Sequence, residues 1–361
     1  MGPTRNFFLL LWLQLGVYGC SSVDDTLLNR QIQSFSSGTV ALAAVIQNDF
    51  ELAEKANSMA FTDNLQFQLE LGGNPETTLK PLFSRTDIAA RWDLLAAMSG
   101  YVETLSLIAT GKAVPSTFAS VSSVINGLKS LDYRQFDLTH SLSILDTQAL
   151  ISDISIFQEL FILPARDKKL AAIIQAGDAA VKKTAMLLYI DIGEVQDQSG
   201  TCSYSVPAND TDQSISSLRL CRGGLRAIVD TAIKSDVDTW KGKLALLKNQ
   251  NGVGGTGVSS TIIQKLVAAQ KLGQLLDQTL IETQAALVAM VGAHGDIVDT
   301  LNPENGVAFA TPVLNSRSGI FLQKVIMAKA IVQSAEDALA TLSQAPTITS
   351  ILSNSGGQND K

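Results

Sequence analysis

The sequence is poor in the residues that most enzymes use for chemistry, with three cysteines and two histidines among 361 residues. The histidines, His140 and His294, are far apart, and neither stands at a metal-site spacing from acidic residues. No Gly-x-Ser-x-Gly elbow and no His-Glu-x-x-His helix motif occurs. We therefore expect a protein that is not an enzyme and that holds no metal and no cofactor.

Proline and aromatic residues are also scarce, with nine prolines and an aromatic content of 6%. Alanine, leucine, glutamine and serine are abundant, and this composition favours helices over a β-sandwich. The hydrophobic content of 46% is enough for a sizeable core. The composition predicts an all-α fold, an elongated antiparallel bundle of several long helices.

Positive charge is in deficit, because 27 basic residues face 34 acidic ones and the net charge is −7. The first 19 residues contain Arg5 and no acid, so their removal leaves 26 basic and 34 acidic residues, or −8. An acidic surface repels phosphate backbones, and nucleic acid is therefore not an expected partner.

Residues 1–19 have the pattern of an export signal. Arg5 precedes an apolar run from Phe7 to Leu15, and small residues follow before Cys20. This run is too short to cross a bilayer as a helix of the mature protein.

The end of this segment, Val17-Tyr18-Gly19-Cys20, resembles the lipobox of bacterial lipoproteins. That resemblance implies a lipid on Cys20, which becomes the mature amino terminus. Ser21, in place of an aspartate, is similar to outer-membrane lipoproteins, which implies an outer-membrane anchor with the protein facing the periplasm. Tyr18 stands where most lipoboxes have a small residue, and ordinary cleavage with secretion is the alternative.

Three regions are expected after the signal. Residues 20–83 are predicted to hold the lipidated terminus, a polar leash, a first helix and an extended connector. Residues 84–344 are predicted to form the bundle, and residues 345–361 a disordered tail.

Ser36-Ser37-Gly38 predicts a weak point in the first helix. Leu65, Phe67, Leu69 and Leu71 alternate with polar residues, which is typical of a strand or extended connector. Bundle helices are expected at about 84–111, 116–131, 136–162, 165–196, 211–248, 259–301 and 312–342.

The longest pattern runs from Ser259 to Leu301 and contains no proline. At a rise of ~1.5 Å per residue this helix is roughly 64 Å long. Its period of 3.5 residues requires other helices packed along it, and the helices expected at 165–196, 211–248 and 312–342 can fill that role. The seam consists of Ile262, Leu266, Ala269, Gly273, Leu276, Leu280, Thr283, Leu287, Met290, His294, Ile297 and Leu301.

His294 is the polar exception on this seam, and Gly292 and Gly295 flank it. One interpretation is a core histidine with its hydrogen bonds satisfied. The other is a ligand-binding or pH-sensing residue beside a small cavity.

Cys202 and Cys221 are the two thiols that remain once Cys20 carries a lipid. Export leads to an oxidising compartment, so we expect a disulfide between them, with two free thiols as the alternative. Closing a loop of about 20 residues contributes ~3 kcal/mol in the chain-entropy model.

Acidic residues that are close in sequence, such as Asp236 with Asp238 and Glu336 with Asp337, are interpreted as solvated helix faces. The sequence thus predicts a lipid-anchored envelope protein that presents long helices to another envelope protein. One alternative is a secreted membrane-active or pore-forming helical component, for which Ala285–Ala293 is the most apolar mature run. Another is a bundle that binds a small ligand near His294.

Overall fold

A computed structural model describes residues 25–75, 79, 82, 85–112, 167–193, 224–250, 256–301 and 310–343. Nearly all of these residues are helical, and none of them forms a strand, which confirms the predicted all-α bundle. The helices are α2 (Asp25–Glu70), α3 (Arg85–Ala109), α6 (Asp167–Ile192), α7 (Gly224–Gln250), α8 (Thr256–Leu301) and α9 (Ala310–Ser343).

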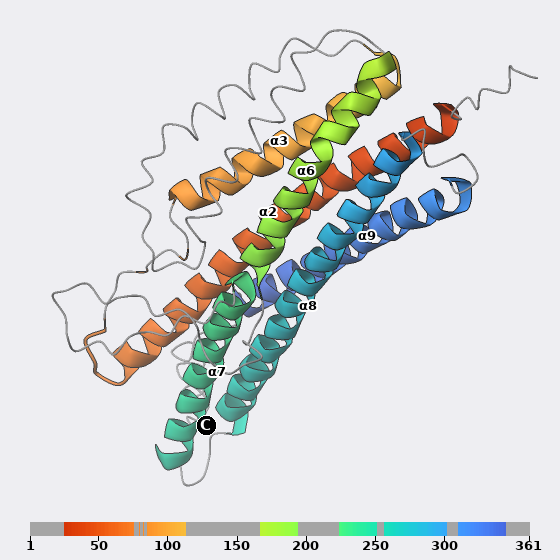
Figure 1. Cartoon of the computed structure of the whole chain (residues 1–361). Coiled ribbons are helices and arrows are strands. Elements are labelled where there is room, and N and C mark those ends of the chain that lie inside the picture. The colour runs from red at the N-terminus through yellow and green to blue at the C-terminus, as the bar shows by residue number, and fades with distance from the viewer. Residues whose placement is uncertain are drawn as a thin grey trace, which may run out of the picture.

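Three long helices, α2, α8 and α9, run side by side along the bundle (Figure 1). α8 is antiparallel to α2, because Thr283 meets Asp49 while His294 meets Phe35. α8 is also antiparallel to α9, since Arg317 pairs with Asp296 and the Lys265 ammonium contacts the Leu342 carbonyl. The bundle is therefore elongated and largely antiparallel.

The shorter helices flank different halves of these three. α3 and α6 pack on the half that contains His294, and α7 packs on the half that contains Trp240 (Figure 1). α6 and α7 follow one another along α8, because Asp178 of α6 contacts His294 whereas Arg226 of α7 pairs with Asp277. We call these the His294 half and the Trp240 half.

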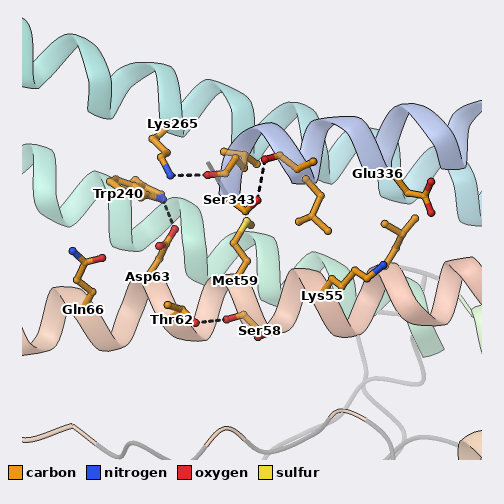
Figure 2. Close-up of a pocket in the computed structure, with 14 residues that line it drawn as sticks. Lys55, Ser58, Met59, Thr62, Asp63, Gln66, Trp240, Lys265, Glu336 and Ser343 are labelled. Atoms are coloured by element: carbon orange, nitrogen blue, oxygen red, sulfur yellow. Dashed lines mark hydrogen bonds between the residues drawn. The ribbon is translucent and has the colours of Figure 1, made fainter. Parts of the chain in front are cut away.

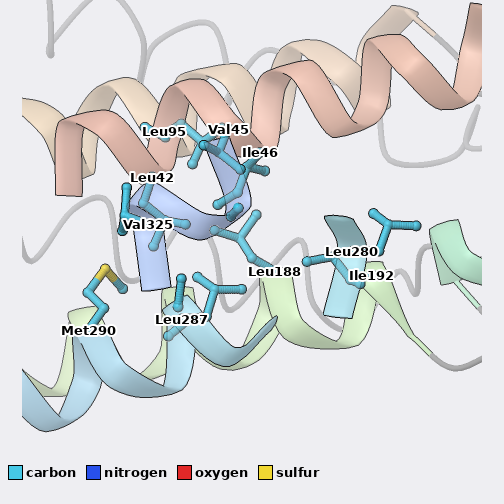
Figure 3. Packing of buried hydrophobic residues seen from close by; sticks show 14 of the residues in the cluster. Leu42, Val45, Ile46, Leu95, Leu188, Ile192, Leu280, Leu287, Met290 and Val325 are labelled. Atoms are coloured by element: carbon cyan, nitrogen blue, oxygen red, sulfur yellow. The ribbon is translucent and has the colours of Figure 1, made fainter. Parts of the chain in front are cut away.

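The predicted seam of α8 faces the core. Nine of its twelve residues are buried, and the other three, Leu266, Gly273 and Leu301, are partly exposed. Leu42, Val45, Ile46, Leu95, Leu188 and Val325 meet this seam from the other helices (Figure 3). The heptad pattern of residues 259–301 thus predicted both the helix and its buried face.

The ends of helices α3, α6 and α9 lie within four residues of the expected ranges 84–111, 165–196 and 312–342. The expected helix at 211–248 corresponds to α7, and its first part lies outside the described residues, as do the expected helices at 116–131 and 136–162 and the predicted tail at 345–361. None of the helices in the described part of the chain has a stretch long and apolar enough to cross a membrane.

The expected weak point at Ser36-Ser37-Gly38 is wrong, because α2 passes through it without interruption. Gly38 serves packing here. A Cβ atom at residue 38 would lie 2.5 Å from a ring carbon of Phe321, so only glycine lets α9 approach α2 this closely. The cost of glycine in a helix, about 1 kcal/mol, is offset by the buried Phe321 ring.

The extended connector expected at Leu65–Leu71 is also wrong, since α2 remains helical through Glu70. The Phe67 ring packs over Gly242 of α7, and the Asn64 amide donates to the Thr239 hydroxyl at 3.2 Å. Gly72 lies two residues beyond the end of α2, and its φ of +76° fits the turn after a helix C-terminus. α2 packs against α3, α7, α8 and α9, so the first helix is an integral part of the bundle rather than a segment that precedes it.

Candidate functional site

The structure describes only one of the residues that the sequence singled out as candidate site residues. Cys20, Cys202, Cys221 and His140 lie outside the described residues, so the lipid attachment and the disulfide stay predictions. His294 lies on α8 in the His294 half, and its side chain is fully buried.

Both ring nitrogens of His294 have partners. Nε2 lies 3.0 Å from the Tyr101 hydroxyl of α3, and Nδ1 lies 3.2 Å from a carboxylate oxygen of Asp178 of α6. A carboxylate accepts hydrogen bonds, so we assign the proton to Nδ1, and Nε2 then accepts the Tyr101 proton. The Lys182 ammonium donates to the other Asp178 oxygen at 2.6 Å. The network therefore joins α3, α6 and α8.

The surroundings of His294 are apolar and close-packed. The Phe35 ring of α2 lies 5.2 Å from the imidazole, measured between ring centroids. A Cβ atom at residue 177 would overlap the Tyr101 hydroxyl, so Gly177 makes room for the tyrosine to reach His294. The glycines that the sequence places beside His294, Gly292 and Gly295, do not form this contact.

Burial lowers the pKa of His294, and this effect exceeds the attraction of the Asp178 carboxylate, which favours the charged form. Burial, together with the negative charge of Asp178, raises the pKa of Tyr101, so the phenol keeps its proton. The imidazole is therefore neutral at pH 7 and has both nitrogens engaged. This geometry favours the core interpretation of His294.

Replacing Tyr101 with phenylalanine is expected to lower the free energy of unfolding by about 1–2 kcal/mol, because the buried Nε2 of His294 loses its donor. Urea denaturation at pH 7 measures this effect. The control is Tyr189→Phe on α6, where the tyrosine is 40% exposed and should lose little stability. Equal effects of the two substitutions would contradict the proposed hydrogen bond.

A second polar cluster lies in the Trp240 half, beside a cavity of about 620 Å³ between α2, α7, α8 and α9 (Figure 2). Trp240 of α7 is at its centre. The indole Nε1 donates to Asp236 at 3.0 Å and to Asp63 of α2 at 3.2 Å. The ammonium groups of Lys243 and Lys265 lie 4.6 Å and 5.2 Å from the centre of the ring, within cation–π distance.

Asp236 is fully buried, so its interpretation as part of a solvated face is wrong, whereas Asp238 has a side chain that is 72% exposed. Burial, followed by the charge of Asp63, raises the pKa of Asp236 to about 7. Burial and the nearby Asp63 therefore favour the protonated form of this carboxyl. Glu336 lines the cavity, and Asp337 is exposed as expected.

The two lysines are held by backbone and carboxylate groups. The Lys265 ammonium donates to the Leu342 carbonyl at 2.8 Å, near the end of α9. Burial lowers the pKa of Lys265, while the charges of Asp63 and Asp236 oppose this shift. Lys243 is buried and lies 3.8 Å from a carboxylate oxygen of Glu70. The cluster thus combines two acids, two lysines and one indole, and three of its members, Asp63, Trp240 and Lys265, line the cavity.

This cluster was not predicted from the sequence, although the sequence contains one signal of it. Asp236 follows Ile233 by three residues and precedes Trp240 by four, so all three share one face of a helix. An acid between two large apolar residues on one face indicates a buried carboxylate. Within the same described ranges, no group of three or more histidine, cysteine or acidic side chains is arranged to hold a metal ion.

Comparison of the chain with protein-family models, with curated proteins and with solved structures finds no match of any of the three kinds.

Proposed function

We propose that this chain is a lipid-anchored helical protein of the bacterial outer membrane, facing the periplasm, that binds another envelope protein and does not act as an enzyme. The observation that carries the proposal is the position of the lipobox-like cysteine relative to the bundle. Cys20 precedes the start of α2, Asp25, by five residues. Five residues reach at most about 17 Å, so a lipid on Cys20 would hold the bundle directly at the bilayer surface.

An exposed apolar surface on α6 and α8 supports the partner-binding part of the proposal. α6 is antiparallel to α8, because the Gln284 amide donates to the carbonyls of Tyr189 and Gly193 while Asp178 meets His294. This register places Met186 at about the same level along the bundle as Val288, and the two side chains are 65% and 62% exposed. Tyr189 and Ile281 add exposed apolar area. A cluster of this kind is typical of a protein-binding surface; we call it the α6–α8 patch.

The membrane anchor is tested by the Cys20→Ser substitution. Acyl chains contribute ~0.8 kcal/mol for each buried methylene, so their loss is expected to move the protein from the membrane fraction to the soluble fraction. The assay is cell fractionation combined with labelling by a radioactive fatty acid. Cys202→Ser is the matched control and should stay labelled and membrane-bound. A Cys20→Ser protein that is still labelled or still in the membrane fraction would contradict the anchor.

The binding surface is tested by a photo-crosslinking amino acid at position 288 in intact cells. We expect a discrete crosslinked product with an envelope protein, and its loss when Met186 is replaced with glutamate. Position 270 on α8 is the control, since Gln270 is an exposed polar residue outside the α6–α8 patch. Equal crosslinking from both positions would show that residue 288 does not lie in a specific interface.

A further inference from the structure

The side of α8 that faces away from the core carries a second heptad pattern. Alternating steps of three and four residues lead from Lys271 to Asp299, and none of the residues on this path is buried. A heptad period is typical of a helix face that packs against another helix. We call this set the outer seam: Lys271, Gln274, Gln278, Ile281, Ala285, Val288, Gly292, Gly295 and Asp299.

The glycines of the outer seam have no packing role within the described part of the chain. A Cβ atom at residue 295 would meet nothing within 4 Å, and one at residue 292 would lie 3.8 Å from a side-chain carbon of Arg317. Each glycine costs a helix about 1 kcal/mol relative to alanine. Because small residues allow a second helix to approach closely, we interpret these two positions as room for the side chains of a partner helix.

Charge on the outer seam occurs only at its two ends. Lys271 is exposed at one end and Asp299 at the other, and neither pairs with a residue of the described ranges. They are 28 residues apart, which is four heptads, so they lie on one line along α8. A second copy of α8 in the antiparallel direction matches this pattern, because it brings opposite charges together at both ends. The parallel direction would bring like charges together.

We propose that two copies of this chain pair through the outer seam, with their α8 helices antiparallel and a two-fold axis at Ala285. Ile281 and Val288 also belong to the α6–α8 patch. The inference therefore rests on the proposed function, in which this patch binds a protein, and it names a second copy of the chain as that protein.

The residues of the outer seam complement one another in this register. Residues equally distant from Ala285 along α8, one in each copy, lie at the same level within one residue. The glutamines then lie over glycines, the two branched apolar side chains lie side by side, and the ends form ion pairs. The facing pairs, one residue from each copy, are Lys271 with Asp299, Gln274 with Gly295, Gln278 with Gly292, Ile281 with Val288, and Ala285 with itself.

The helices on either side of α8 extend this surface. Met186 and Tyr189 of α6 are exposed on one side. On the other side, Ile320 and Met327 of α9 are exposed and share a helix face with Lys324, whose ammonium donates to α8. The outer seam is about 42 Å long, and with these flanks the surface is about 20 Å wide. Roughly 800 Å² is the share of each partner in an interface of standard size.

The test is sedimentation velocity of the purified full-length chain at about 50 μM, where we expect a dimer. Lys271→Glu places a carboxylate against Asp299 of the second copy, and Asp299→Lys places an ammonium against Lys271. Each variant alone is expected to raise the Kd of the dimer about 100-fold. An equal mixture of the two variants should form dimers as tightly as the original chain, because both end contacts then join opposite charges.

The matched control is Lys329→Glu, which makes the same change of charge at an exposed lysine of α9 outside the outer seam and should leave the Kd unchanged. Thermal melting checks that the variants are folded. If a charge variant fails to fold, Ala285→Arg, which places two like charges at the two-fold axis, should abolish the dimer by itself. A monomeric original chain, a dimer that Lys271→Glu or Ala285→Arg leaves unchanged, or a mixture of folded charge variants that stays monomeric would each overturn the proposal.

The dimer and the proposed function can fail independently. A crosslink from residue 288 to a different envelope protein in cells, together with a monomeric purified chain, would overturn the dimer and leave the proposed function standing. Loss of the membrane anchor with an intact dimer would do the reverse.

Discussion

Replacing Asp49 with asparagine is expected to raise the free energy of unfolding by about 2–4 kcal/mol at pH 7. Asp49 of α2 is buried among the long helices, and the Thr283 hydroxyl donates to its Oδ2 at 2.7 Å. Burial raises the pKa of Asp49 from 3.8 to about 8, and the hydrogen bond from Thr283 only partly opposes this shift. Asparagine keeps an acceptor for Thr283 and removes the ionisation.

The raised pKa of Asp49 also determines how the stability of the protein changes with pH. Between pH 4 and pH 8 the folded chain keeps the Asp49 proton while the unfolded chain releases it. Asp49 therefore contributes stability at low pH, and this contribution is lost as the pH rises toward 8. His294 acts in the opposite direction, since its lowered pKa costs stability as the pH falls below its unfolded value.

The measurement is urea denaturation from pH 4 to pH 8 for the original chain and for Asp49→Asn. The difference between the two should grow with pH across this range. Glu51→Gln, an exposed acid one half-turn away on α2, is the control and should give no such trend. A difference that stays constant from pH 4 to pH 8 would show that Asp49 is ionised in the folded protein.

The second large change in stability is expected on substitution of the ion pair of Arg91 and Asp191, which connects α3 to α6. The guanidinium donates to both carboxylate oxygens, at 2.9 Å and 3.2 Å, and both side chains are almost fully buried. Replacing Arg91 with methionine is expected to lower the free energy of unfolding by about 3–5 kcal/mol, because it removes the guanidinium that pairs with the buried Asp191 charge.

The double variant Arg91→Met, Asp191→Leu distinguishes two contributions to the free energy of unfolding. One is the cost of burying the Asp191 charge without Arg91, and the other is the net stabilisation by the ion pair. It removes both charges and should be more stable than Arg91→Met alone. Arg226→Met is a useful comparison, since its partner Asp277 is partly exposed and the loss should be smaller. A double variant less stable than Arg91→Met would mean that apolar side chains do not fill this site.

The part of the fold that follows from local periodicity could be predicted from sequence. The seam from Ile262 to Leu301 repeats every 3.5 residues, so it defines α8 and its buried face without any knowledge of the partner helices. The C-terminal end of α3 was predictable from residue type, because a glycine commonly follows a helix, and Gly111 takes the positive φ of that position.

Contacts between distant residues could not be predicted. Helix propensity alone predicts that Gly38 weakens α2. In the folded chain Phe321, which is distant in sequence, packs directly on Gly38. The same holds for His294, whose hydrogen-bond partners Tyr101 and Asp178 are 193 and 116 residues away. The histidine was visible in the sequence, and its partners were not.

The Trp240 cavity could not be predicted from the sequence for a different reason. Its walls come from four helices, and its polar groups are ordinary helix-surface residues when each helix is read alone. Lys265 and Asp63 meet Trp240 only because α2, α7, α8 and the last turns of α9 pack together there. A cavity formed between four helices has no local sequence pattern.

The position of α2 has a consequence for biosynthesis. α2 is the first helix of the described chain, yet its core partners on α8 and α9 come last, and the hydrogen bond between Asp49 and Thr283 joins residues 234 apart. At synthesis rates of about 5–20 residues per second, those partners emerge roughly 10–50 s after α2. During that interval α3 can cover Phe50 through Trp92, but the apolar side chains of α2 that face α8 and α9 lack their native partners. We therefore expect the nascent chain to expose apolar surface of α2 until its last two helices are made.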